Sequence, residues 1–80
     1  MTTKKECGKY IVACRKFWEG VAEYRYYNLE VWATSAKHAE NIAKKAGHKI
    51  QPYTSAYLTN EPQQEMSADD FILANYLIFA

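Results

Sequence analysis

The sequence predicts a small α+β domain in which an antiparallel β-hairpin is followed by a helix, a third strand and an apolar C-terminal helix. Two stretches rich in β-branched and aromatic residues flank a single glycine, which is typical of a hairpin. The spacing of apolar residues then changes from two to between three and four, which indicates a helix. With 80 residues, the chain has room for one domain.

The hairpin is expected over residues 9–34, with "KYIVACRKFW" as its first strand and "VAEYRYYNLEVWAT" as its second. Glu19 and Gly20 lie between the two strands. Glycine adopts positive φ at little cost, so these two residues fit a two-residue hairpin turn.

Such a turn pairs Val12 with Tyr27 and assigns every strand residue to a face, because successive side chains of a strand point to opposite sides of the sheet. One face is the predicted core and holds Tyr10, Val12, Cys14, Tyr27, Leu29, Val31 and Ala33. The second face is mixed and aromatic and holds Ile11, Ala13, Arg15, Phe17, Tyr24, Tyr26, Glu30 and Trp32.

A capped amphipathic helix is expected over residues 35–46. Thr34 or Ser35 supplies an N-cap, and Gly47 fits the left-handed position that follows a helix. Lysines favour the last turn, where the helix dipole is negative. The apolar stripe is narrow and consists of Ala36, Ala39, Ile42, Ala43 and Ala46.

A third strand is expected over residues 49–58, with Pro52 marking an edge position or a bulge. The chain then divides into an N-terminal tail over residues 1–8, a β-β-α-β unit over residues 9–59 and a polar linker over residues 60–66.

The C-terminal helix is expected over residues 67–80, opened by Ser67 with Asp70 three positions later. A final strand at "NYLIFA" is the alternative. No charged side chain follows Asp70, and a helix that is apolar on all sides must be buried against another surface. Either it packs across the aromatic face and buries Tyr24 and Tyr26, or it packs on a partner or on a second copy in a homodimer.

The composition limits the function classes. A formal net charge of +1 disfavours proteins that hold duplex DNA by neutralising phosphates. Lys4 and Lys5 precede no apolar region of a secretory signal, and the longest apolar run is too short to cross a bilayer, so no membrane association and a cytoplasmic location are expected. Cys7 and Cys14 are then expected to be free thiols.

Catalytic and metal-binding chemistry is sparse. Cys14 and His38 are a thiol and a base, but Cys14 falls on the predicted core face, where cysteine is usually inert. His38 and His48 belong to no recognised metal-ligand spacing. No catalytic residue, metal or cofactor is therefore expected.

Binding to a protein partner fits the residues better, because tyrosine, tryptophan and arginine are the types that anchor interfaces. A single-stranded RNA or DNA stacked on the same aromatic face is the alternative. The expected contact residues are Arg15, Tyr24, Tyr26 and Trp32, with a second, basic patch of Lys37, Lys44 and Lys45 on the helix.

The stretch from Lys9 to Gly47, a hairpin running into "VWATSAKHAENIAKKAG", resembles the plan of small phage and mobile-element proteins, including anti-CRISPR and other anti-defence inhibitors. The pattern A-x-S-x-x-x-A-E-x-I-A, which encodes a cap and an alanine face, carries this resemblance. The resemblance implies a protein that inhibits a host nuclease or its guide complex by occupying a surface. The plan is also similar to the antitoxin half of some toxin and antitoxin pairs.

Overall fold

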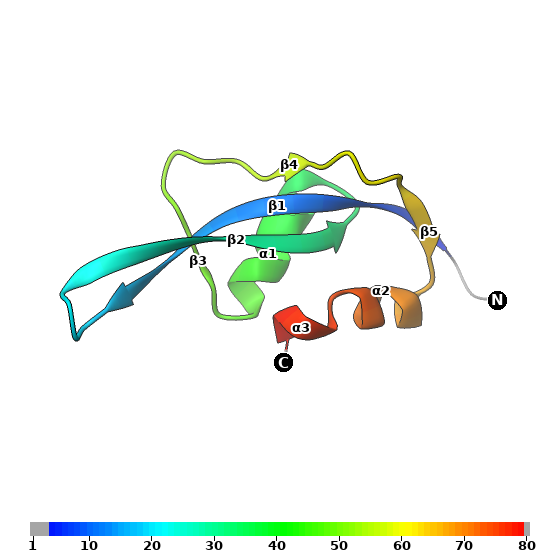
Figure 1. Cartoon of the computed structure of the whole chain (residues 1–80). Helices are drawn as coiled ribbons and strands as arrows, with labels where there is room; N and C mark the ends of the chain where they lie inside the picture. The colour runs from blue at the N-terminus through cyan, green and yellow to red at the C-terminus, as the bar shows by residue number, and fades with distance from the viewer. Residues whose placement is uncertain (1–3, 80) are drawn as a thin grey trace.

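The computed structural model describes residues 4–79 and confirms the α+β class. Five strands and three helices follow one another along the chain, and α1 crosses behind the long hairpin while α2 and α3 run beneath it (Figure 1). The molecule is elongated, with principal extents of 50 × 23 × 17 Å. The elements are β1 (Lys5–Trp18), β2 (Glu23–Ala33), α1 (Ala36–Lys45), β3 (Lys49–Ile50), β4 (Tyr57–Leu58), β5 (Gln64–Met66), α2 (Ala68–Ala74) and α3 (Tyr76–Phe79).

Strand β1 is the centre of the sheet, because all four other strands pair with it in antiparallel fashion. Strand β2 pairs along eleven residues of β1 and forms the hairpin. The three short strands pair with successive parts of β1, in the order β3, β4 and β5 from the hairpin end towards the N-terminus. Every short strand therefore depends on β1 for its position.

The predicted two-residue turn was wrong. Four residues, 19–22, connect the strands, and the turn is held by hydrogen bonds of 3.3 Å from Val21 N–H to the Trp18 carbonyl and from Ala22 N–H to the Glu19 carbonyl. Ala22 takes the positive φ of 51° that had been expected of Gly20.

The longer turn shifts the register by two residues, so that Val12 pairs with Leu29 rather than with Tyr27. Because the shift is even, each side chain keeps its predicted face.

The predicted core face is confirmed. Val12 and Val31 are fully buried beneath α1, and Tyr10, Tyr27 and Leu29 are partly buried at the margin of the same cluster. The alanine stripe of α1 lets the helix lie close to the sheet, which buries apolar area that stabilises the fold. The central residues of the core are Val12, Cys14, Val31, Ala33, Ala39, Ile42 and Ala43.

Helix α1 begins and ends close to the predicted positions. The Ser35 hydroxyl is the N-cap and accepts a hydrogen bond of 3.1 Å from His38 N–H. At the other end, Gly47 has a φ of 94°, and Gly47 N–H donates to the Lys44 carbonyl while His48 N–H donates to the Ala43 carbonyl. These bonds satisfy carbonyls that the helix end leaves open.

Three predicted boundaries were wrong. Strand β1 begins at Lys5 rather than at residue 9, because residues 5–7 pair with β5, which itself lies inside the predicted linker. The third strand is interrupted and forms β3 and β4. The interruption covers residues 51–56 and includes Pro52, which lacks the N–H that a continuous ladder requires, and Tyr53 follows with a φ of 62°.

The C-terminal helix begins as predicted but is interrupted at Asn75 and resumes as α3, and residue 80 of the predicted range lies outside the described residues. Ser67 and Asp70 form a reciprocal capping box at the start of α2. The helix ends at Asn75, whose side chain turns to the edge of the sheet: its Oδ1 accepts from Trp32 N–H and its Nδ2 donates to the Trp32 carbonyl, both at 2.9 Å. Asn75 is 1% exposed. The C-terminal segment is thus attached to the outer edge of β2.

The C-terminal segment therefore does not cover the Tyr24 and Tyr26 end of the second face. Phe71 and Ile78 pack against the core cluster beneath the sheet. Within residues 4–79, no helix combines the length and the apolar character that are needed to span a membrane.

Candidate functional site

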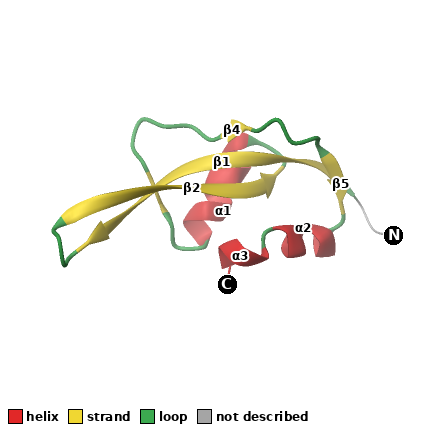
Figure 2. Ribbon diagram, in the orientation of Figure 1, coloured by secondary structure: helices red, strands yellow, loops and turns green. Residues whose placement is uncertain are grey.

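The second sheet face lies opposite α1, and no other described segment is drawn across it at the hairpin end (Figure 2). We call it the open face. Arg15, Tyr24 and Tyr26 all lie on it, because they occupy alternate positions of paired strands. Trp32 is on the same face but lies six residues further along β2 from Tyr26, about 20 Å away. The structure therefore brings together three of the four predicted contact residues.

Arg15, Tyr24 and Tyr26 lie together with Phe17, and we call these four residues the aromatic cluster. The guanidinium carbon of Arg15 lies 4.3 Å from the centre of the Tyr24 ring, and the Phe17 and Tyr24 rings meet edge to face with centres 5.2 Å apart. Arg15 is directly opposite Tyr26 in the register, and Phe17 is opposite Tyr24. Tyr26 is 63% exposed and Phe17 is 48% exposed. Rings held in this way lose little entropy when they bind.

Arg15 is the charged member of the aromatic cluster and is only half-buried. Its Nε atom is buried and has no hydrogen-bond acceptor. Within residues 4–79, the ion pairs involve Lys9 and Arg25 but not Arg15. Its charge therefore remains available to an external acceptor.

Sequence reasoning missed Tyr57 as a member of the open face. Strand β4 places it opposite Ile11, and it is 58% exposed. No sequence signal identified this position, because β4 has only two residues and its register depends on the loop that follows Pro52.

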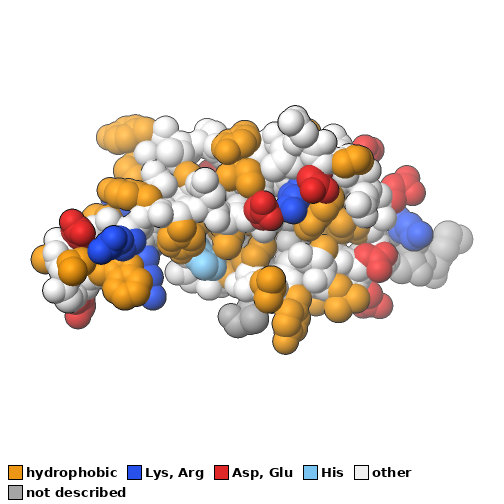
Figure 3. All heavy atoms as spheres, viewed as in Figure 1, with side chains coloured by type: hydrophobic (Ala, Val, Ile, Leu, Met, Phe, Trp, Pro, Cys, Tyr) orange, Lys and Arg blue, Asp and Glu red, His pale blue; other side chains and the backbone are white. Residues whose placement is uncertain are grey.

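The predicted basic patch on α1 is divided. Lys37 lies in the first turn of the helix, whereas Lys44 and Lys45 lie in the last. Lys44 alone of the three lines a hollow beside Arg15 and Lys49. Basic side chains do lie beside hydrophobic ones at the hairpin end of the molecule, at the left of Figure 3.

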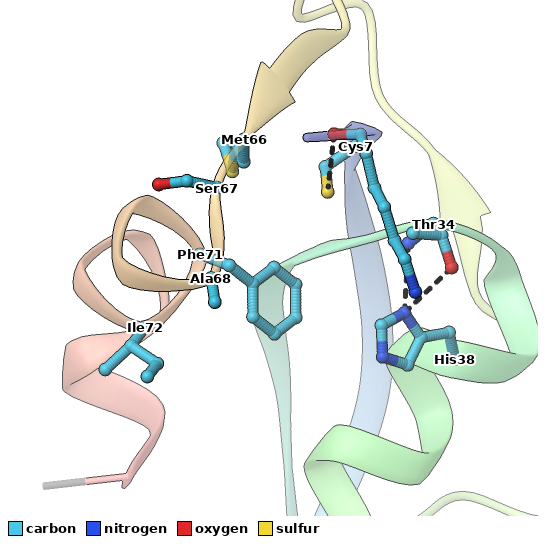
Figure 4. A pocket seen from close by; sticks show the side chains of 9 residues that line it. Cys7, Thr34, His38, Met66, Ser67, Ala68, Phe71 and Ile72 are labelled. Atoms are coloured by element: carbon cyan, nitrogen blue, oxygen red, sulfur yellow. Dashed lines mark hydrogen bonds between the residues drawn. The ribbon is translucent and has the colours of Figure 1, made fainter. Parts of the chain in front are cut away.

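A separate pocket of about 360 Å³ lies between the start of β1, α1 and α2. The Phe71 and His38 rings stack beside it with centres 5.6 Å apart, and the Cys7 thiol lies near Met66 (Figure 4). His38 Nδ1 accepts a hydrogen bond of 3.1 Å from Thr34 N–H. This ring nitrogen of His38 is thus already bonded within the chain.

The thiols do not form the nucleophile and base pair considered from the sequence. The Cys14 thiol donates to the Val12 carbonyl at 3.6 Å, and Cys7 donates to the Lys5 carbonyl at 3.6 Å. Burial raises the pKa of both thiols, which favours the unreactive protonated form. Both cysteines are free, as expected. Within residues 4–79, no three His, Cys, Asp or Glu side chains gather as metal ligands do.

Comparisons of this chain with protein families, with curated proteins and with solved structures found no match. The two paired strands and capped helix that underlie the resemblance to anti-defence inhibitors are present. The inhibitory function that this resemblance implies stays a prediction.

Proposed function

We propose that this chain is a non-catalytic protein-binding module, an inhibitor or an adaptor, that engages its partner through the aromatic cluster of the open face. The observation that carries the proposal is the exposure of Tyr26 and Phe17 around an arginine stacked on Tyr24, on a face that the fold leaves uncovered. Large exposed aromatic groups on a small domain are characteristic of interaction surfaces.

The residue types of the cluster favour a protein partner. Tyrosine and arginine dominate the energetics of protein interfaces, where they fill pockets and lose their contact with water. The Arg15 side chain combines a charge with a flat surface that packs on Tyr24. An acidic or aromatic anchor on the partner would contact both features at once. The free thiols are consistent with a cytoplasmic setting for such a complex.

Single-stranded nucleic acid is a second candidate, favoured by one observation. Two cross-strand pairs near the aromatic cluster are both cationic, namely Arg15 with Lys49 and Lys16 with Arg25. Cations beside stacking rings are the usual arrangement for binding single strands. Self-association is a third outcome, because Leu73 and Leu77 of the C-terminal segment are strongly exposed.

The variant Tyr26→Ala tests the proposal against the control Tyr53→Ala, which removes a fully exposed tyrosine from a loop away from the aromatic cluster. The full chain is immobilised, extract of its native cell is passed over it with and without prior nuclease treatment, and the retained protein is purified for affinity measurement. We expect Tyr26→Ala to weaken the complex by about tenfold or more, and Tyr53→Ala to leave it unchanged.

Equal affinities for the two variants would contradict the assignment of the open face. A ligand that nuclease removes, and whose binding to a labelled single strand weakens steeply between low and high salt, would establish the nucleic-acid candidate instead. Retention of only a second copy of the chain would replace both candidates with self-association.

A further inference from the structure

A second feature lies beside the aromatic cluster, at the edge formed by β3. It is a shallow hollow of about 670 Å³ where β1, the end of α1 and β3 meet. Three cationic side chains line it, from Arg15, Lys44 and Lys49, together with one carboxylate, from Glu40. Three positive charges and one negative charge leave a formal charge of +2 around the hollow.

The three cations are not neutralised by the described part of the chain. Within residues 4–79, none of Arg15, Lys44 and Lys49 has a carboxylate oxygen within the 4.0 Å of an ion pair, although Glu40 lines the same hollow. By contrast, Lys9 on the same face as Arg15 has a carboxylate oxygen of Glu30 at 3.0 Å. The hollow therefore concentrates unpaired positive charge.

The pairing of β1 with β3 adds to this concentration. Arg15 and Lys49 are directly opposite each other in the register. Like charges at directly opposed positions destabilise a sheet. The buried Nε of Arg15 also lacks an acceptor. An arrangement that is unfavourable in the free protein becomes favourable when an anion binds between the cations.

A histidine side chain completes the hollow. His48 lines it, and the Tyr27 hydroxyl lies 2.6 Å from His48 Nδ1. Burial, with a smaller contribution from Cys14, raises the pKa of Tyr27, so the phenol keeps its proton. Either partner can donate in this hydrogen bond, and the His48 ring adds a polar group to the lining of the hollow.

We propose that this hollow binds a phosphate monoester dianion. The charge of such a group, between −1.5 and −2 near neutral pH, matches the formal charge of the hollow. Its oxygens accept hydrogen bonds from several donors at once, and a guanidinium binds two of them in parallel. The site is distinct from the aromatic cluster, although Arg15 contributes to both, and it does not depend on the identity of the partner of the open face.

The test is a titration of the full chain with inorganic phosphate at pH ~8, where the dianion is the main form. Binding is monitored through the NMR signals of the backbone amides of residues 47–51. The variants Lys44→Gln and Lys49→Gln are compared with Lys45→Gln, which removes the neighbouring charge of the same helix but does not line the hollow. We expect the first two to weaken phosphate binding by at least about threefold, and the third to leave it unchanged.

Thermal denaturation supplies a second measurement. Without phosphate, Lys49→Gln is expected to melt at a higher temperature than the parent chain, because it removes the like-charge pair with Arg15. In phosphate, the parent chain is expected to gain stability and this variant to gain much less. Replacing a residue with only a structural role would not raise the melting temperature without phosphate and at the same time reduce the stabilisation that phosphate gives.

Dimethyl phosphate, a monoanion, and sodium chloride at the same ionic strength are the ligand controls. The proposal is overturned if dimethyl phosphate produces the same signal changes as phosphate, since the hollow would then not require a dianion, or if sodium chloride does, since the effect would then be screening. It is also overturned if Lys45→Gln weakens binding as much as Lys44→Gln. Tighter binding of phenyl phosphate than of inorganic phosphate would support the site and show that its ligand reaches the aromatic cluster.

Discussion

Replacing Asn75 with alanine is expected to lower the free energy of unfolding by about 2–4 kcal/mol, because both backbone groups of Trp32 would lose their partners at once. Asn75 is buried, and its amide makes one hydrogen bond in each direction with the β2 edge. It therefore substitutes for a neighbouring strand. Urea denaturation followed by tryptophan fluorescence and by circular dichroism measures the change.

The variants Asn60→Ala and Asn75→Asp sharpen this prediction. Asn60 is exposed in a loop, so its replacement should change stability by less than about 0.5 kcal/mol. Aspartate at position 75 keeps the acceptor for Trp32 N–H but cannot donate to the Trp32 carbonyl when it is ionised, so it should also destabilise. If Asn75→Ala is as stable as Asn60→Ala, the C-terminal segment is not attached as described.

Replacing Ile42 with alanine is expected to destabilise the fold by about 2–4 kcal/mol, because it leaves a cavity between α1 and the sheet. Ile42 is the largest side chain that α1 contributes to the core. The other buried residues of the helix are Ala39 and Ala43, which cannot extend to fill the space. The free energy of unfolding again comes from urea denaturation.

Ile72→Ala is the matched control, because it makes the same substitution on an exposed face of α2. Its effect should be below about 1 kcal/mol, since little apolar area returns to water and alanine favours the helix. Equal losses for Ile42→Ala and Ile72→Ala would mean that α1 does not pack on the sheet through its alanine stripe.

The parts of the fold that local sequence patterns determine were predicted. Alternation along the two long strands assigned Val12 and Val31 to the core. This assignment stays the same when the register shifts by an even number of residues. Helix α1 has a cap at Ser35 and a glycine stop at Gly47, so its ends follow from short-range interactions.

The parts that depend on distant contacts were not predicted. Asn75 lies 43 residues from Trp32, and nothing near it in the sequence marks it as a partner for a strand edge. Strand β5 is polar and has only three residues, so its pairing with β1 is visible only in the folded chain. The turn differed because Ala22, which is not a usual residue for positive φ, adopts that conformation.

In the candidate site, too, local patterns predicted one part and distant contacts determine the other. The aromatic cluster follows from strand alternation, which already placed Arg15, Tyr24 and Tyr26 on one face. The hollow does not, because it joins Arg15 to Lys44 and Lys49 through the pairing of β3 with β1. A stretch of two paired residues is too short for its register to be read from the sequence.

The central claim is that the folded chain leaves Tyr26 open, and tyrosine nitration of the full chain tests it most directly. The reaction is followed with time at low protein concentration and assigned to each tyrosine by peptide mass spectrometry. Tyr53 is the fully exposed reference, and the half-buried Tyr27 is the protected one. The structure predicts that Tyr26 reacts nearly as fast as Tyr53. A rate for Tyr26 as slow as that for Tyr27 would mean that the open face is covered, and would contradict the account.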